Sequence, residues 1–287
     1  MAVFRRGIHF GSYGTVDDGP AVFGRLRAAA AAAEAAGFDA ISVPDHVHQN
    51  RVGGGPGSPM FEAYTLLGAL AAHTSSVRLL ALVSPVTMRS PALLAKAVTT
   101  LDVLSGGRAV LGLGAGWDAA EAAAYGIGFP PVGERMDRLD EALQVCRALF
   151  REPRASVAGA HYRVSDARNS PRPVRGTIPI LVGGGGERRT LDLVARYADA
   201  CNVGGDPATV ARKLAVLARH CERAGRDPAE ITRTVFATAI PADLAEFARQ
   251  LAAYAAAGAE GVVVLGRPDD AGRITALGQA VMAAFPP

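Results

Sequence analysis

Apolar residues gather in eight short runs along the chain, and a longer stretch with helical spacing of apolar and polar positions follows each run. The runs are almost continuously apolar, which is typical of strands covered on both faces. We predict strands at 7–11, 39–44, 77–84, 108–114, 178–183, 199–204, 232–238 and 260–265. The longer stretches predict helices at 20–37, 61–74, 91–105, 134–151, 187–197, 207–225, 241–257 and 268–284.

Proline and glycine mark the ends of several predicted helices. Pro91 and Pro207 stand at first helical positions, where the missing backbone N–H group has no helical partner to lose. Gly37, Gly225 and Gly258 follow the last turns of three helices, where a left-handed residue is favoured. These signals support a strict alternation of strands and helices.

Eight strands alternating with eight helices predict a single domain, residues 1–287, with the α/β fold of a closed (β/α)8 TIM barrel. A doubly wound open sheet is the alternative architecture, but it usually has fewer strands. The segment 115–177 is much longer than the other connections and contains a stretch rich in proline and arginine. We interpret this segment as an insertion between strands 4 and 5, beside the mouth of the barrel.

The net charge of +3 is spread along the chain, and no alternation of aromatic and basic residues accompanies it. This composition argues against a nucleic-acid partner. The three cysteines are widely separated and lack the spacing of metal ligands, which is typical of core thiols in a reducing compartment. With no recognisable secretory leader and no apolar run of transmembrane length, we expect a cytoplasmic protein without membrane contact.

Catalytic residues of such barrels lie at the carboxyl ends of the strands. These ends include few strong nucleophiles and no group of residues with the spacing of metal ligands. A site with so few reactive side chains is expected to use the chemistry of a bound cofactor. The strand-end positions are His9, Ser12, Asp45, His46, Ser84, Pro85, 114–117, 183–187 and Asn202.

Four consecutive glycines, Gly183 to Gly186, follow an apolar strand and precede a predicted helix. Their backbone can approach a ligand closely, and the N–H groups at the start of the helix suit a phosphate. Arg188 or Arg189 could add positive charge there. A plain glycine-rich turn is the alternative, because the run does not match the GxGxxG dinucleotide pattern.

His46 follows Asp45 at the end of the second predicted strand. Histidine is the side chain that in general changes its charge near neutral pH, so a histidine at this place can give or take the proton that accompanies a hydride. An equally good interpretation is a histidine that supports the loop, held by Asp45. The position alone does not choose between the two.

Trp117 is the only tryptophan and lies just beyond the fourth predicted strand. At a barrel mouth it can form a wall for a flat ring system, or it can plug the space under the 115–133 loop. Glu121 lies one turn further along the chain. We interpret Glu121 as a helix-capping group in preference to a second acid of the site.

The elements SGGR, GLGAGW and GGGGE occur in this order and resemble the luciferase-like oxidoreductases. The segments that carry this resemblance are 77–143 and 179–203. A further set of residues is similar to the branch of the family that uses coenzyme F420, an 8-hydroxy-5-deazaflavin: Asp45, His46, His161–Tyr162 and Asn169–Pro171. The resemblance covers most of residues 1–205, and beyond them the match extends only to the barrel.

The resemblance implies a deazaflavin or flavin that lies in the barrel mouth and exchanges a hydride at its central ring. It also implies a non-proline cis peptide bond behind that ring, and the distance to Ser84 places this bond at Ala81–Leu82. His46 is the expected catalytic residue, and His9, Tyr13 and Trp117 are expected to contact the substrate. The residues expected to bind the cofactor are Asp45, His46, Ala81, Leu82, Ser84, Ala115, Gly116, Trp117, Gly183, Gly184, Gly185 and Gly186.

The sequence departs from the family pattern at the site. The branch that oxidises sugar phosphates has a catalytic carboxylate where this chain has Trp117, so a sugar phosphate is not the expected substrate. Relatives often read GWN and EH where Asp118 and Ala122 stand here, which removes one polar group that could face the substrate.

The leading hypothesis is an F420-dependent oxidoreductase that reduces an activated C=C or C=N bond of a small organic molecule, or oxidises an alcohol. A monooxygenase that uses reduced FMN is the alternative enzyme, because both cofactors carry a tricycle and a phosphate. A barrel that binds a flavin without turnover is the third hypothesis, in which His46 would be dispensable. No metal is expected in the site, and the resemblance suggests a homodimer.

Overall fold

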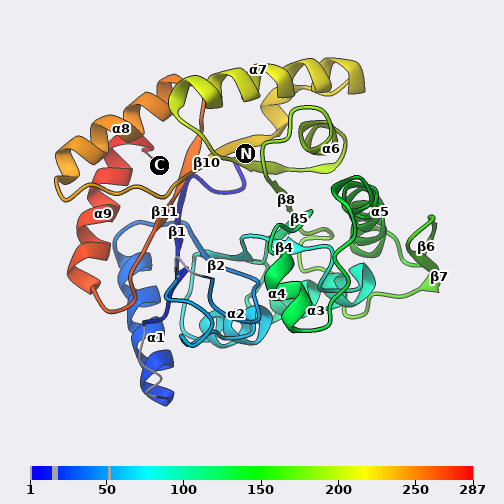
Figure 1. Cartoon of the computed structure of the whole chain (residues 1–287), viewed down its shortest axis with the longest axis horizontal. Coiled ribbons are helices and arrows are strands. Elements are labelled where there is room, and N and C mark those ends of the chain that lie inside the picture. Colours follow the sequence, from blue (N-terminus) through cyan, green and yellow to red (C-terminus); the bar gives the residue numbers. More distant parts are fainter. Residues whose placement is uncertain (1, 15–18, 51–52, 287) are drawn as a thin grey trace.

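The computed structural model describes residues 2–14, 19–50 and 53–286. Parallel strands form a ring that helices surround (Figure 1). The strands of the ring are β1 (Arg6–His9), β2 (Ala40–Val43), β3 (Arg78–Ala81), β4 (Ser84–Pro85), β5 (Leu111–Gly114), β8 (Ile180–Gly183), β9 (Ala200–Val203), β10 (Thr232–Ala237) and β11 (Gly261–Leu265). The helices that cover it are α1 (Pro20–Ala35), α2 (Ala63–Ala71), α3 (Pro91–Leu104), α5 (Val132–Arg151), α6 (Thr190–Tyr197), α7 (Pro207–Ala224), α8 (Leu244–Ala256) and α9 (Ala271–Ala284). None of the described helices combines the length and hydropathy that crossing a bilayer requires.

Hydrogen bonds join the strands in the order β3-β2-β1-β11-β10-β9-β8-β5-β4. β3 and β4 are two halves of the predicted strand 77–84. Each of the other predicted strands matches one strand of the ring. A parallel bridge between Leu79 and Ala109 joins β3 to the residues that lead into β5 and closes the ring. Closure removes the exposed edge that an open sheet would have. The predicted (β/α)8 barrel is confirmed.

The boundary signals of the helices act as the sequence predicts. Pro91 and Pro207 are the first residues of α3 and α7. Gly37, Gly225 and Gly258 have φ angles of +85°, +64° and +97° beyond the ends of α1, α7 and α8. One boundary differs: α6 begins at Thr190, after a turn, and not directly after the glycine run.

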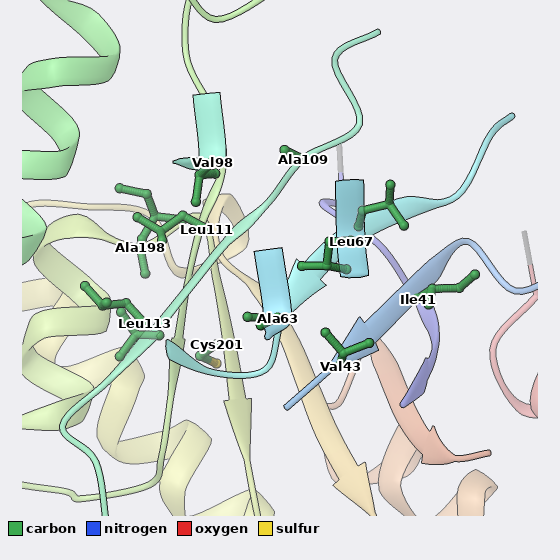
Figure 2. Packing of buried hydrophobic residues seen from close by; sticks show 14 of the residues in the cluster. Ile41, Val43, Ala63, Leu67, Val98, Ala109, Leu111, Leu113, Ala198 and Cys201 are labelled. Atoms are coloured by element: carbon green, nitrogen blue, oxygen red, sulfur yellow. The ribbon is translucent and has the colours of Figure 1, made fainter. Parts of the chain in front are cut away.

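Strand residues alternate between two apolar layers, because successive side chains point to opposite faces. The outer layer lies between the strands and the helices, and Figure 2 shows part of it, with side chains from β2, β5 and β9 beside side chains from α2 and α3. The inner layer fills the barrel and contains Phe4, Ala40, Leu80, Val110, Leu181, Ala200 and Val263. The interior is therefore a packed core, and a ligand can bind only above it, at an end of the strands.

The third barrel strand is interrupted between β3 and β4. The peptide bond Leu82–Val83 is cis, so the expectation of a cis bond at Ala81–Leu82 is wrong by one residue. Ala81 is fully buried in the outer layer, whereas Leu82 and Val83 pack against the inner layer. Leu82 and Val83, which follow β3, therefore lie at the barrel mouth and line the pocket there. Ala81 faces the helices instead.

The insertion 115–177 has two parts in different places. Its first part contains α4 (Ala119–Ala124), a helix that the sequence analysis did not predict, and leads into α5. Its second part is the hairpin of β6 (Ala155–Ala158) and β7 (Arg163–Ala167), which packs against α5 on the outside of the barrel (Figure 1). Glu141 of α5 accepts hydrogen bonds from the backbone of residues 160–162 at the tip of this hairpin. The expected place beside the mouth is correct only for the first part.

Arg108, the arginine of the SGGR element, joins several segments beneath the barrel and is only 9% exposed. Its Nη2 donates to the carbonyls of Ala71 and Thr74, at 2.9 and 3.0 Å. Its Nη1 donates to the Val77 carbonyl at 3.0 Å, and its Nε donates to the Ser105 carbonyl at 2.7 Å. One guanidinium thus satisfies carbonyls at the ends of α2 and α3 and before β3.

We expect Arg108→Met to lower the free energy of unfolding by about 2–4 kcal/mol, because several buried carbonyls lose their donor. Urea denaturation followed by circular dichroism measures this change. Arg163→Met is the matched control, since Arg163 is exposed on β7, and it should change the free energy by less than about 0.5 kcal/mol. Equal stabilities of the two variants would contradict the structural role of Arg108.

Candidate active site at the barrel mouth

A pocket of about 440 Å³ opens at the carboxyl ends of the strands. Its wall combines the interrupted third strand, the glycine run and the first part of the insertion, which lie far apart in the sequence. The sequence-predicted residues that line it are Asp45, His46, Leu82, Pro85, Gly114, Ala115, Gly116, Trp117, Gly183, Gly184 and Asn202. Lining residues that the sequence analysis did not select for the site include Val83, Asp118, Glu121, Phe129, Thr190 and Phe236.

Glu121 is the buried partner of His46. Its side chain is only 1% exposed, and its Oε2 lies 2.7 Å from Nδ1 of His46. Its Oε1 accepts hydrogen bonds from the backbone N–H groups of Val47 and His48, at 2.7 and 3.3 Å. The N-cap of α4 is Asp118, which accepts from the N–H of Glu121 at 3.0 Å. The interpretation of Glu121 as the capping group is therefore wrong.

The contact with Glu121 fixes the way in which His46 can act. A carboxylate at Nδ1 favours the ring form that carries a proton on this nitrogen. The other ring nitrogen, Nε2, is then available to a ligand in the pocket that His46 lines. Asp45 was the wrong partner, because the acid that holds the ring is Glu121, but a held ring and a ring that lines the pocket are compatible.

Trp117 lies at the rim of the pocket and is 66% exposed. This exposure contradicts the interpretation as a plug under the 115–133 loop. The indole meets the His46 ring edge-on, with 5.4 Å between the ring centroids. Phe129 and Val132 continue the apolar wall on the same side. Trp117 is thus positioned as a pocket wall.

Asp45 anchors a second hydrogen-bond network and is 2% exposed. Its Oδ2 accepts from the hydroxyl of Ser84 at 2.6 Å and from Nε of Arg89 at 3.0 Å, and its Oδ1 accepts from Nη2 of Arg89 at 2.7 Å. Hydrogen bonding to Asp45 raises the pKa of the Arg89 guanidinium. The Tyr64 hydroxyl lies 2.8 Å from the Ser84 hydroxyl. Ser84 is fully buried under this network and does not line the pocket, so it positions Asp45.

His9 and Tyr13 lie behind the pocket wall. His9 is 5% exposed, and its Nδ1 lies 2.9 Å from the hydroxyl of Ser42 inside the barrel. Its ring packs against Phe236, which does line the pocket. Tyr13 is 2% exposed and packs against Phe61. Neither side chain reaches the pocket surface in this structure, and their contact with substrate stays a prediction.

The glycine run crosses the edge of the pocket. Gly183 and Gly184 line it, and Gly184 has a φ angle of +112°, which favours glycine. Gly185 and Gly186 continue the turn toward α6 beyond the lining. Arg189, one of the two arginines considered for a phosphate, turns away and pairs with Asp137 of α5 at 2.6 Å.

One imidazole and two carboxylates gather at the pocket rim, which the spacing in the sequence did not reveal. Single ligand atoms of His46, Asp118 and Glu121 lie within 4.8 Å of one another. All three side chains already take part in hydrogen bonds at this place, Glu121 with His46 and Asp118 with the start of α4. These bonds account for the positions of Glu121, His46 and Asp118.

The fold and the pocket agree with one family of proteins. The chain belongs to the luciferase-like monooxygenase family, whose sequence model matches residues 5–280. An F420-dependent glucose-6-phosphate dehydrogenase of Kineococcus radiotolerans is 34% identical over 216 residues, which are 74% of this chain and 62% of that protein. This chain thus spans less than two thirds of that relative. The predicted family, and with it the prediction of an enzyme, is confirmed.

Solved structures with this fold cover nearly the whole chain. An F420-dependent secondary alcohol dehydrogenase, in complex with an F420-acetone adduct, has a TM-score of 0.83 at 18% identity and covers 99% of both chains. The coenzyme F420-dependent tetrahydromethanopterin reductase of Methanopyrus kandleri has a TM-score of 0.78 at 19% identity, over 98% of this chain and 99% of that one. At these identities the likeness shows a shared barrel fold.

The buried His9 makes the stability dependent on pH. Burial first, and then the charge of His46, lowers the pKa of His9 from 6.5 to about 3. Between these values the unfolded chain binds more protons than the folded protein, so the His9 contribution is fully present above pH 6.5 and is lost as the pH falls. At pH 5 this loss amounts to about 2 kcal/mol.

We therefore expect His9→Gln to flatten the curve of unfolding free energy against pH between pH 7 and 5, measured by urea denaturation. The comparison uses the slope of the curve, so a change in overall stability does not affect it. His161→Gln, on the outer hairpin, is the control and should keep the wild-type slope. An unchanged slope in His9→Gln would show that His9 is not held neutral by burial.

Proposed function

We propose that this protein is an oxidoreductase that binds coenzyme F420 at the barrel mouth and exchanges a hydride with a small uncharged substrate. One observation carries the proposal: the interrupted third strand and the glycine run meet at one pocket, beside a histidine held by a buried carboxylate. The resemblance of the motifs to the F420-using branch and the similarity to the F420-dependent dehydrogenase of Kineococcus radiotolerans support the choice of cofactor.

The backbone around the pocket fits a flat, phosphorylated ligand. A Cβ atom at Gly114 would lie 2.7 Å from a methyl group of Val83, and a Cβ atom at Gly183 would lie 2.8 Å from the other. Only glycine at these two positions allows β5 and β8 to approach Val83 so closely. Leu82 and Val83 form the apolar floor that would support a ring system. The turn that begins at Gly184 offers backbone without side chains for the phosphate end. When bound, F420 supplies or accepts the hydride.

His46 handles the proton in the proposed reaction. In the oxidation of an alcohol to a carbonyl compound, in which the bound cofactor would take the hydride, Nε2 of His46 would accept the hydroxyl proton. Glu121 stabilises the resulting imidazolium, because its carboxylate lies 2.7 Å from Nδ1. In the reduction of a C=C or C=N bond the same proton moves in the opposite direction. Both directions use the same two residues.

The pocket wall favours a neutral substrate. Asp45, Asp118 and Glu121 are acidic, and no lysine or arginine belongs to the part of this wall that the described residues form. These acids already have partners, so an anionic substrate such as a sugar phosphate would find no cation in this described part of the wall to offset its own charge. Trp117 and Phe129 offer apolar contact instead. A small alcohol, imine or activated alkene with an apolar part suits this wall.

A monooxygenase that uses reduced FMN is the second candidate, because the family includes monooxygenases by name. FMN has the same tricyclic shape and also carries a phosphate, so the glycine run suits both ligands. The two cofactors differ in chemistry: the flavin has a nitrogen where the deazaflavin has a carbon, and only the reduced flavin activates oxygen. Oxygen consumption therefore distinguishes the two functions.

Trp117, as the only tryptophan, reports cofactor binding directly, since it lies at the rim of the proposed site. We expect its emission to be quenched by F420 with a dissociation constant below about 1 μM, and at least tenfold more weakly by FMN. Fluorescence titration of the purified protein with each cofactor measures both constants. Tighter binding of FMN, together with oxygen uptake after its reduction, would reject F420 in favour of the second candidate.

We expect His46→Ala to reduce turnover by about 100-fold or more, because the proton loses its acceptor or donor. Binding of F420, followed by Trp117 emission, should change by less than about threefold. The activity assay follows the visible absorbance of F420 with a panel of small secondary alcohols and, in reverse, of imines and activated alkenes. His48→Ala is the control and should retain turnover, because His48 contacts its own loop at the Gln49 carbonyl.

Full activity of His46→Ala would reject His46 as the catalytic residue. Cofactor binding without any turnover in the wild type would favour a barrel that binds a flavin without catalysis.

A further inference from the structure

A lysine on α7 reaches the glycine run from outside the pocket. The ammonium of Lys213 lies so close to the backbone of Gly185 that a Cβ atom there would stand 2.5 Å from Nζ. Nζ donates one hydrogen bond, to the carbonyl of Gly204 at 2.8 Å. An ammonium has three protons, and Lys213 forms no ion pair with any residue in the described ranges. Its charge is thus placed at the turn without a carboxylate to neutralise it.

A hydroxyl reaches the same run from the other side. Thr190 is the first residue of α6 and is 9% exposed, and it lines the pocket. A Cβ atom at Gly186 would stand 2.8 Å from its hydroxyl oxygen. Within the described part of the chain this hydroxyl has no hydrogen-bond partner. Thr190 is therefore a largely buried residue that lines the pocket and whose hydroxyl is open to bond a ligand there.

The start of α6 adds backbone donors at this place. Its N-cap residue, Arg189, forms no side-chain bond to the first turn. The N–H of Leu191 in this turn donates to the carbonyl of Gly186 at 3.0 Å, so the helix start contributes its positive end and only the N–H groups that remain. The positive end of a helix attracts an anion. The helices α6 and α7 lie side by side near the end of β8 (Figure 1), which brings this helix start and Lys213 to the same turn.

We propose that Lys213 and Thr190 complete a phosphate subsite on the glycine run, with Lys213 as its cation. The proposal rests on the proposed function, because the phosphate in question is that of the bound cofactor. Lys213 donates its remaining N–H groups to phosphate oxygens, and the hydroxyl of Thr190 donates to another oxygen. The shared chemistry is a phosphate ester, either the monoester of FMN or the diester of F420.

The other cations near the turn have different partners. Arg189 pairs with Asp137, and Arg212 pairs with Glu187 of the turn itself. Arg188 is exposed to solvent. The sequence analysis considered Arg188 or Arg189 as the positive charge beside a phosphate. In the structure Lys213, on the next helix, suits this role better.

The test compares ligands with and without the phosphate in Lys213→Gln, Thr190→Val and wild-type protein. Dissociation constants for F420, for FMN and for the corresponding phosphate-free deazaflavin and riboflavin are measured by quenching of Trp117 emission. We expect Lys213→Gln to weaken binding of the phosphorylated cofactor about tenfold and Thr190→Val about fivefold. Neither variant should change the binding of the phosphate-free ligands by more than about twofold. The salt dependence of cofactor binding should also decrease in Lys213→Gln.

Arg188→Gln is the matched control, since it removes the same charge from the same turn, and it should bind all ligands like the wild type. Thermal unfolding of each variant establishes that the barrel is intact. Equal weakening with and without the phosphate would show that Lys213 only holds the turn, and unchanged binding would also overturn the subsite. If the wild type binds FMN but not F420, the subsite stands and the F420 assignment fails. If it binds neither cofactor, both proposals fail.

Discussion

Close packing of the interrupted third strand against its neighbours is the constraint on which the site depends. Val83, at the interruption, lies so near β5 and β8 that any side chain at Gly114 or Gly183 would collide with it. Nonbonded carbon atoms normally stay about 3.5–4.0 Å apart, so two glycines are required where these strands meet. The pocket forms directly above this junction, and its floor is therefore set by backbone that the whole barrel holds in place.

Each buried carboxylate around the pocket has its own set of hydrogen-bond or ion-pair partners. A buried carboxylate is stable only with hydrogen bonds or a cation, and each acid here has them. Glu121 has His46 and two backbone N–H groups, and Asp45 has Ser84 and Arg89. The acids thus surround the part of the pocket where a proton would move, while the lysine ammonium stands at the glycine turn. The insertion supplies Trp117 and Glu121 together, so one segment provides both the apolar wall and the group that orients the histidine.

The barrel and most of the pocket could be predicted from the order of residues alone. The periodicity of apolar residues and the positions of proline and glycine are local signals, and they depend little on which strands become neighbours. Because residues at the carboxyl ends of parallel strands always share one face of such a barrel, His46, Leu82, Trp117 and Gly183 could be assigned to one site before their distances were known. The family motifs added the cofactor class, which no periodicity can indicate.

The pairings within the site depend on contacts between distant segments, so they became visible only in the folded chain. Glu121 lies 75 positions from His46 in the sequence, and no local pattern distinguishes a capping glutamate from one that reaches across the mouth. The distance to Ser84 along the chain did not place the cis bond correctly, because no local pattern of residues fixes the backbone between β3 and β4. His9 and Tyr13 were placed at the mouth by their order in the chain, yet inward packing covers them. Lys213 illustrates the same limit: its helix is predictable, but its contact with the glycine run depends on how two helices lie against the barrel.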